Sequence, residues 1–292
     1  MRRVLVTGAG GKTGAAVLAA LADAGARTVA LVRSDSHPSG AADERVVGDQ
    51  RDVDVLARAM AGVDAMYAIA PNLSPDEVAM TRAALEVCGR SGVRRFVLHS
   101  VVHPQLRAMP HHADKRRAEE LVIESGLDWT ILQPNAYLQN LAAYVPGMRA
   151  GLLRVPYSVD LGHALVDLRD VAAVATSVLL DDLGVHATLE LSGPRPCTMR
   201  DVAAEASRIL GHAVEAERFD PGQHVAGLPL PDEERRSRLL AMLRHYDLHG
   251  SPGDATVLRA LLGREPGGLG DVLAVLLDAA SDGRGPMAAP DR

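Results

Sequence analysis

The feature that most limits how this chain can fold is a glycine-rich run between a short apolar strand and a helical pattern. The predicted strand at residues 4–7 leads into Gly8-Ala9-Gly10-Gly11-Lys12-Thr13-Gly14, and a helical pattern covers residues 12–24. Glycines allow a tight turn and bring backbone N–H groups close to a pyrophosphate, to which the helix N-terminus adds positive charge. The run therefore predicts a dinucleotide-binding loop, with contacts from Gly8, Gly10, Gly11, Lys12, Thr13 and Gly14.

Two other interpretations of this run remain open. Gly11-Lys12-Thr13 looks like the end of a P-loop, but a P-loop needs a glycine five residues before Gly11, and Val6 stands there. A plain turn between a strand and a helix, without a ligand, is the other alternative. The position of the run, directly after a strand and at a helix start, favours the dinucleotide loop.

The first two-thirds of the chain alternates β-branched runs with helical patterns, which is typical of parallel βαβ units. Further strands are predicted at 28–32, 45–47, 65–70, 95–99, 129–132 and 189–191, and further helices at 53–61, 74–89, 114–125 and 170–180. Ser74-Pro75-Asp76-Glu77 has the pattern of a helix start, with Ser74 as N-cap and Glu77 three residues later. The pattern predicts an α/β fold with a Rossmann-type, doubly wound parallel sheet.

The last hundred residues contain mainly helical patterns, at 198–211, 233–245 and 254–263. We therefore expect a smaller, helix-rich C-terminal lobe. The predicted division is a nucleotide-binding domain at 1–133 and 161–192, a substrate lobe at 134–160 and 193–280, and a flexible tail at 281–292.

Composition excludes several classes of function. The net charge of −6 argues against a general electrostatic grip on nucleic acid. No apolar stretch approaches the roughly 18 residues of a membrane span. Two distant cysteines, Cys88 and Cys197, have no metal or redox spacing and fit a reducing compartment. We expect a cytoplasmic protein, a monomer or homodimer, with a small-molecule substrate and no metal, membrane or nucleic-acid partner.

The end of the second predicted strand indicates which nucleotide is bound. An NAD site usually places an acidic residue near this point for the ribose 2′-hydroxyl, whereas this chain has Arg33 and Ser34. Arg33 can pair with a 2′-phosphate and Ser34 can add a hydrogen bond, so NADP(H) is favoured over NAD(H). A solvated surface arginine is the alternative. Asp49 and Ala70, which end later strands, are assigned to the cofactor by position, with Asp49 beside the adenine.

Several motifs in a fixed order carry a family resemblance: V-T-G-A-G-G-K-T-G at 6–14, V-R-S at 32–34, V-V-G-D at 46–49, V-R-R-F-V-L-H-S at 93–100 and the stretch 111–135. Together they resemble the NmrA-like group of atypical short-chain dehydrogenases/reductases over roughly residues 4–280. The resemblance implies a Rossmann core with a small C-terminal substrate lobe. The group includes NADPH-dependent quinone, azo-dye and phenolic-ether reductases, and also nucleotide-binding redox sensors that catalyse nothing. The related motif usually reads T-I-L-R-P, and here Gln133 replaces the arginine.

The candidate catalytic residues differ from the usual Tyr-x-x-x-Lys pair, because none of the five tyrosines has lysine four residues later. Instead, His111 and Lys115 are one helical turn apart and share a face with apolar residues such as Ala118 and Val122. An inward lysine on an apolar face needs a partner, and a cofactor ribose or a substrate oxygen would serve. The resemblance also places a lysine here, often with a histidine four residues earlier. A surface role for Lys115, and His112 in place of His111, remain alternatives.

Three further residues lie where α/β sheets bind ligands, after the carboxyl ends of strands. Ser100 ends the strand at 95–99 and is similar to the serine that contacts substrate in reductases. Asn135 and Tyr137 follow the strand at 129–132 and are expected to border the nicotinamide end of the site, Asn135 toward both cofactor and substrate and Tyr137 toward substrate. A turn or packing role is the alternative for each.

These residues predict an NADPH-dependent reductase that transfers hydride to a small quinone-like, carbonyl-containing or conjugated substrate. A quinone needs little acid assistance, because its reduced form is a stabilised phenolate. The alternatives are a non-catalytic NADP(H)-binding redox sensor and a non-redox enzyme, an isomerase or cyclase, on the same fold.

Overall fold

The computed structural model describes residues 1–36 and 40–279, which form two compact units. The first unit contains Met1–Leu106, His111–Pro134 and Val171–Glu190. The second unit contains Arg107–Pro110, Asn135–Asp170 and the residues from Leu191 onward. The flexible tail predicted at 281–292 lies outside the described residues.

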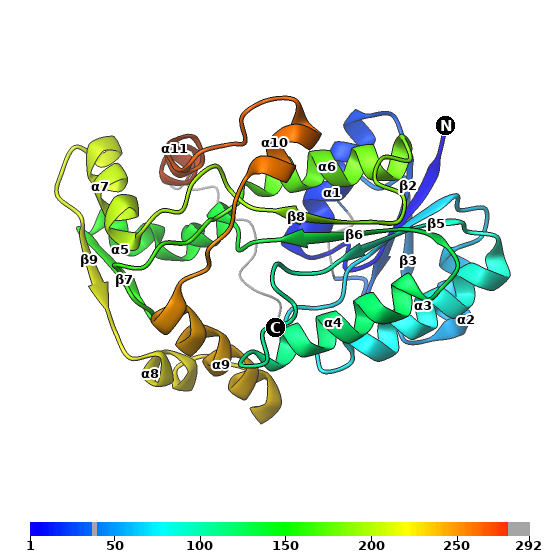
Figure 1. Ribbon diagram of the computed structural model, residues 1–292, viewed down its shortest axis with the longest axis horizontal. Helices are drawn as coiled ribbons and strands as arrows, with labels where there is room; N and C mark the ends of the chain where they lie inside the picture. The colour runs from blue at the N-terminus through cyan, green and yellow to red at the C-terminus, as the bar shows by residue number, and fades with distance from the viewer. Residues whose placement is uncertain (37–39, 280–292) are drawn as a thin grey trace. The chain divides into compact units, whose positions relative to one another are not determined.

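The first unit is built on a seven-stranded sheet in the order β3-β2-β1-β4-β5-β6-β8 (Figure 1). The six strands from β3 to β6 pair in parallel, with Val4 beside Thr28 on one side and Ala65 on the other. Reversal of the strand order at β1 is the mark of a doubly wound sheet, so the predicted fold class is confirmed. The strands are β1 (Arg3–Val6), β2 (Arg27–Val32), β3 (Glu44–Val47), β4 (Ala65–Ala68), β5 (Arg95–His99), β6 (Asp128–Pro134) and β8 (Ala187–Leu191).

Helices cover both faces of this sheet (Figure 1). One face carries α1 (Lys12–Asp23) and α6 (Leu168–Leu180), and the other carries α2 (Val53–Ala59), α3 (Glu77–Ser91) and α4 (Pro110–Ile123). The strands are buried on both sides, which explains their continuous apolar sequences.

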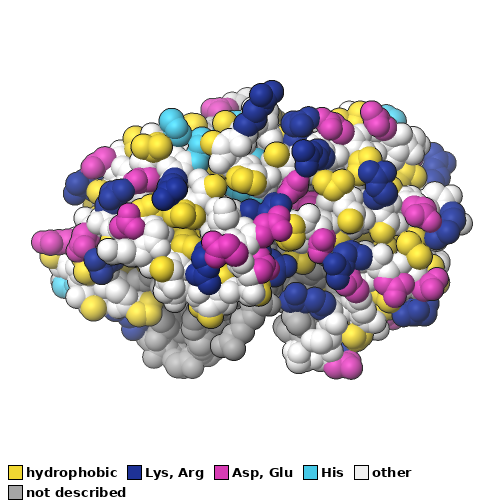
Figure 2. All heavy atoms as spheres, turned by 90° about the horizontal axis from the view of Figure 1, so that it is seen from below, with side chains coloured by type: hydrophobic (Ala, Val, Ile, Leu, Met, Phe, Trp, Pro, Cys, Tyr) yellow, Lys and Arg dark blue, Asp and Glu magenta, His cyan; other side chains and the backbone are white. Residues whose placement is uncertain are grey.

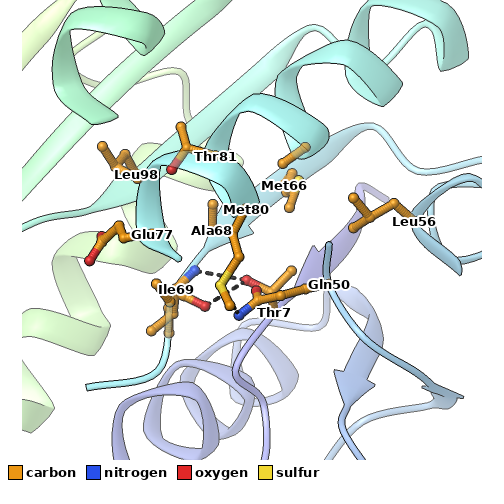
Figure 3. A pocket seen from close by; sticks show the side chains of 12 residues that line it. Thr7, Gln50, Leu56, Met66, Ala68, Ile69, Glu77, Met80, Thr81 and Leu98 are labelled. Carbon is orange, nitrogen blue, oxygen red and sulfur yellow. Dashed lines mark hydrogen bonds between the residues drawn. The ribbon is translucent and has the colours of Figure 1, made fainter. Parts of the chain in front are cut away.

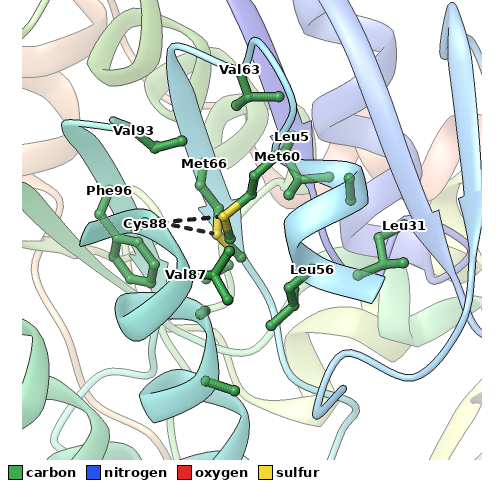
Figure 4. Packing of buried hydrophobic residues seen from close by; sticks show 14 of the residues in the cluster. Leu5, Leu31, Leu56, Met60, Val63, Met66, Val87, Cys88, Val93 and Phe96 are labelled. Carbon is green, nitrogen blue, oxygen red and sulfur yellow. Dashed lines mark hydrogen bonds between the residues drawn. The ribbon is translucent and has the colours of Figure 1, made fainter. Parts of the chain in front are cut away.

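The core on the α2–α3 face is packed around a buried cysteine (Figure 4). The thiol of Cys88 lies 3.8 Å from the sulfur of Met60 and 3.9 Å from that of Met66. Burial raises the pKa of Cys88 to about 12, so the thiolate needed for redox or metal chemistry is not formed. Cys88 is therefore a packing residue.

Two helix starts in the first unit differ from the prediction. Helix α3 begins at Glu77, not at Ser74, because the Ser74 hydroxyl accepts the Asp76 N–H (3.2 Å) in a turn that precedes the helix. Glu77 does not complete a capping box, since its buried carboxylate contacts Lys115. Helix α4 begins at Pro110, four residues earlier than predicted, with proline at a position that needs no N–H donor.

The second unit contains helices around a two-stranded parallel sheet of β7 (Leu152–Val155) and β9 (Glu215–Arg218). The predicted helix from Thr198 is present, with a capping box between Thr198 and Asp201, and the other two predicted helices are present as well. The sequence analysis missed both strands, η1, α5, α8 and α11. The helices are η1 (Leu138–Tyr144), α5 (Val145–Arg149), α7 (Met199–Leu210), α8 (Pro221–Ala226), α9 (Glu233–His249), α10 (Thr256–Leu262) and α11 (Leu269–Ala279).

The boundary of the second unit also differs from the predicted division at residues 161–170. His163 pairs with Cys197 and Ser251, and Val166 pairs with Tyr137. These partners all belong to the second unit, so the segment is held there by backbone hydrogen bonds that no local pattern reveals.

The surface carries charges of both signs. Figure 2 shows basic and acidic side chains interspersed over the face that it displays, and many form exposed pairs, such as Arg208 with Glu205 (2.7 Å). Among the described residues, no helix combines the length and the apolar character needed to cross a membrane.

Candidate active site at the carboxyl edge of the sheet

The glycine loop joins β1 to α1 in a conformation that side chains would obstruct. Gly8 has a φ of +57°, and a Cβ on Gly14 would lie 2.4 Å from the carbonyl oxygen of Gly8. Gly14 therefore lets the first turn of α1 pack directly on the loop. Gly11 is the N-cap of α1, and no side chain caps the first turn, as is typical of helix starts that bind anions.

Thr7 fixes this loop to the end of β4. Its hydroxyl donates to the carbonyl of Ile69 (3.0 Å) and accepts from the Ile69 N–H (2.8 Å), as Figure 3 shows. Next to it is a narrow hollow of about 10 Å³, room for about one water molecule, whose wall includes Gln50, Ala70 and Met80. Ala70, which the sequence analysis assigned to the cofactor, thus borders a hollow beside the glycine loop.

Lys12 and Arg33 supply the cationic groups near the loop. Lys12 is half-buried, and burial lowers the pKa of its amine. Arg33 is exposed directly after β2, and Ser34 shares a hydrogen bond with Ser36 (2.8 Å). The nearest carboxylate after β2, Asp35, is paired with Arg45 (2.7 Å).

Asp49 forms an ion pair that the sequence analysis did not foresee. Arg51 binds the Asp49 carboxylate at 2.6 Å and reaches Asp76 at 2.9 Å. The hydrogen bond from Arg51 lowers the pKa of Asp49. Arg51 adds a second cation on the side of Arg33, since Arg33 also interacts electrostatically with Asp49. The ion pair could have been predicted from the sequence, because a basic residue, Arg51, stands two positions after Asp49.

Lys115 lies on α4 and is held by two groups of the protein. Its ammonium donates to the carbonyl of His99 (2.9 Å) and lies 2.6 Å from the Glu77 carboxylate. A buried ammonium needs a compensating partner, and Glu77 is that partner. The inward position of Lys115 is therefore explained without a ligand. An ammonium has three N–H donors. The described residues engage two of them, which leaves one donor for a ligand oxygen.

The two histidines of α4 are both buried in its first turn. Their rings meet edge to face with centroids 4.5 Å apart, and His112 Nδ1 is 2.9 Å from the carbonyl of His103. Because α4 starts at Pro110, His111 and Lys115 belong to one continuous helix and are one turn apart.

His99, whose carbonyl binds Lys115, has its own ring partner. Its Nδ1 lies 2.8 Å from the hydroxyl of Tyr67 on β4, and both residues are buried. Burial lowers the pKa of His99 to about 3, so the ring is neutral at physiological pH.

Ser100 follows β5, and its hydroxyl donates to the carboxylate of Glu119 on α4. Gln133 at the end of β6 donates to the same Glu119 oxygen (2.8 Å). All three side chains are buried. Glu119 was missed by the sequence analysis, although its position one turn after Lys115 on the inward face of the helix could have revealed it.

Asn135 and Tyr137 belong to the second unit. The Asn135 amide donates to the carbonyl of Ser251 (3.2 Å) and lies 3.4 Å from the hydroxyl of Ser192, so it ties three segments of that unit together. Tyr137 is the N-cap residue of η1 and pairs with Val166. In the first unit, the structure thus brings Lys115 together with Glu77, and Ser100 together with Glu119. In the second unit, the Asn135 side chain forms hydrogen bonds with other residues of that unit.

Comparison with known proteins defines the family. A family model described as NAD(P)H-binding matches residues 8–182, more than half of the chain, so the chain belongs to this family. This membership agrees with the resemblance to the NmrA-like atypical short-chain dehydrogenases/reductases.

Relatives and solved structures extend the likeness over most of the chain. The (4-alkanoyl-5-oxo-2,5-dihydrofuran-3-yl)methyl phosphate reductase of Streptomyces griseus is 34% identical over 74% of this chain and 77% of its own. The NAD(P)H azoreductase of Xenophilus azovorans is 30% identical over 78% and 82%. The NADPH-dependent quinone oxidoreductase of Escherichia coli, solved with NADPH, is 22% identical over 94% and 99%, with a TM-score of 0.79. The class of this protein is an NAD(P)H-dependent oxidoreductase.

Proposed function

We propose that this protein is an NADPH-dependent reductase that transfers hydride to a small quinone-like, carbonyl-containing or conjugated acceptor. The observation that carries the proposal is Lys115, whose ammonium is fixed by Glu77 and the His99 carbonyl and keeps a donor for a ligand oxygen. The names of the relatives point to the same kind of acceptor, because they denote an oxo-dihydrofuran, an azo compound and a quinone.

The glycine loop and its surroundings fit the nucleotide. The backbone of Gly8 to Gly14 and the first turn of α1, which no side chain caps, suit the pyrophosphate, and Ala70 lies beside the same loop. When bound, reduced nicotinamide supplies the hydride. Lys115 then donates a hydrogen bond to the acceptor oxygen or to a ribose hydroxyl, and Ser100 assists at the acceptor oxygen.

Arg33 supports a preference for NADPH. Its exposed guanidinium follows β2, and Asp35, which could have favoured a ribose 2′-hydroxyl, is engaged by Arg45. We expect Arg33→Ser to weaken NADPH binding about 10-fold, the loss of one charge-assisted pair, and to leave NADH binding unchanged. Arg27→Ser, an exposed arginine on the same strand, is the control in a fluorescence titration. Equal weakening of both nucleotides by Arg33→Ser would contradict the assignment.

The proposed function is tested by NADPH oxidation with a panel of quinones and enones, for the wild type and Lys115→Met. We expect the kcat of Lys115→Met to fall at least about 100-fold, with NADPH binding kept within about 10-fold. Arg116→Met, an exposed neighbour on α4, is the matched control. Tight NADPH binding by the wild type without turnover of any acceptor would overturn the reductase proposal and favour a redox sensor or a non-redox enzyme.

A further inference from the structure

A second buried carboxyl group lies one helical turn beyond Lys115. The Glu119 side chain on α4 meets Ser100 at the end of β5 and Gln133 at the end of β6. Glu119 is only 8% exposed, and Ser100 and Gln133 are 3% and 5% exposed. The three side chains form a polar cluster within the core of the first unit, at the carboxyl edge where the proposed reaction takes place.

The donors to Glu119 are both neutral. Ser100 and Gln133 donate to the same carboxylate oxygen, Oε1, while the nearby cation, Lys115, is engaged by Glu77 and the His99 carbonyl. In the part of the chain that the structure describes, two charged groups on α4 act on Glu119: Lys115, which favours its ionised form, and Glu120, which opposes it. The strands β5 and β6 contribute only the Ser100 hydroxyl and the Gln133 amide to its hydrogen bonds. Burial is the dominant effect, and it raises the pKa of Glu119.

The ionisation of Glu119 determines what the Ser100 hydroxyl can do, because a hydroxyl has a single proton. When Glu119 is ionised, that proton is bound by the carboxylate, and Ser100 Oγ offers only lone pairs to a ligand. When Glu119 is protonated, its O–H can donate to Ser100 Oγ, and the serine proton becomes available to an acceptor oxygen.

We propose that Glu119 is the positioning residue that makes Ser100 a proton donor in the reductase reaction. The Glu119 O–H bond breaks as a new O–H bond forms at Ser100 Oγ, and the serine proton passes to the oxygen of the acceptor that has received hydride. One proton moves from Glu119 to the product, and water later returns it. This inference rests on the proposed function, from which both hydride and acceptor come.

Gln133 makes this role possible because it satisfies Glu119 without a charge. An arginine at this position would hold the carboxylate ionised and bind the Ser100 proton permanently. Substitution of Gln133 therefore changes the proton donor without touching Ser100 or Lys115.

The first test is the pH profile of kcat with an enone acceptor, which needs a proton more than a quinone does. In the wild type, kcat falls as the pH rises and Glu119 ionises. We expect Gln133→Arg to move this fall to lower pH by about one unit or more, and Glu119→Gln to lower the acidic plateau about 10-fold and remove the fall. Glu124→Gln, which changes an exposed carboxylate just after α4, is the control. A profile that neither variant changes, or a shift in Gln133→Arg that persists after Ser100→Ala is added, overturns the proposal.

The second test does not need turnover. Infrared titration of the protonated carboxyl band that is lost in Glu119→Gln reports the pKa of Glu119 directly. Ser100→Ala removes a donor to the carboxylate and should raise this pKa, as should Gln133→Met, whereas Gln133→Arg should lower it. Thermal unfolding of each variant detects differences in folding. Gln133→Met and Gln133→Arg should shift the pKa of Glu119 in opposite directions, which a general loss of folding would not do.

The two tests separate the two proposals. A wild type without turnover, combined with a shift of the Glu119 pKa in Ser100→Ala, refutes the reductase function and keeps the Ser100–Glu119 coupling. A Glu119 pKa that Ser100→Ala leaves unchanged refutes the positioning role, whatever the turnover.

Discussion

Two buried carboxyl groups of the first unit, Glu77 on α3 and Glu119 on α4, differ in the charge of their surroundings. Glu77 is paired with the Lys115 ammonium at 2.6 Å, whereas the side-chain donors to Glu119 among the described residues are the neutral groups of Ser100 and Gln133. A cation compensates for the lost hydration of a buried carboxylate, while neutral donors compensate in part, and burial then raises the pKa of the carboxyl group. The same side chain can thus serve as a fixed anion or as a proton carrier, depending on its partner.

The largest expected effect comes from removing the cation of the Glu77 pair. Lys115→Ala leaves a buried carboxylate without compensation, and we expect the free energy of unfolding to fall by about 3–5 kcal/mol. Adding Glu77→Gln removes the uncompensated charge and should restore most of this stability, measured by chemical denaturation, but not the catalytic activity. If the double variant is no more stable than Lys115→Ala, the ion pair is not the reason for the loss.

Two buried histidines, His99 and His163, show the effect of burial on a basic group. Burial lowers the pKa of His99 to about 3 and that of His163 in the second unit to about 4. The folded protein keeps both rings neutral, whereas the unfolded chain binds protons below pH 6.5. Stability is therefore fully present above that pH and lost as the pH falls toward the folded-state pKa values, by about 2 kcal/mol per histidine at pH 5.

Denaturation curves at pH 7 and pH 5 for His163→Gln measure this loss. We expect the variant to lose less stability than the wild type between the two pH values. His212→Gln, which changes an exposed histidine, should behave as the wild type does. An unchanged pH dependence in His163→Gln would show that His163 is protonated as easily in the folded state as in the unfolded chain.

The smallest expected effect is on the stability of variants that neutralise either Glu119 or Glu77. Because the pKa of Glu119 is raised, the folded state binds its proton more tightly than the unfolded chain does, and this contribution is present at low pH and lost as the pH rises through the folded-state pKa. Glu119→Gln should therefore keep or increase stability above neutral pH, within about 1 kcal/mol, whereas Glu77→Gln should decrease it. Thermal unfolding across the pH range checks the signs, and equal signs would contradict the distinction.

Much of the fold could be predicted because its signals are carried by neighbouring residues. The order of strands and helices followed from the alternation of apolar runs with glycine and proline, and Gly8 and Gly14 marked the loop that the structure shows between β1 and α1. The start at Ser74 was predicted incorrectly because a local capping signal competed with a tertiary ion pair of Glu77. The segment 161–170 was placed in the wrong unit because its partners, Tyr137, Cys197 and Ser251, are distant in sequence.

The sequence by itself determined the class of fold, the glycine loop and the inward face of α4 with Lys115, because periodicity and turn chemistry act over a few residues. Only the tertiary structure decided which groups compensate the buried charges. Glu77 precedes Lys115 by 38 residues, and Ser100, Glu119 and Gln133 come from three different elements. The pKa of a buried group depends on what packing places around it, and these neighbours meet only when the sheet and α4 have assembled.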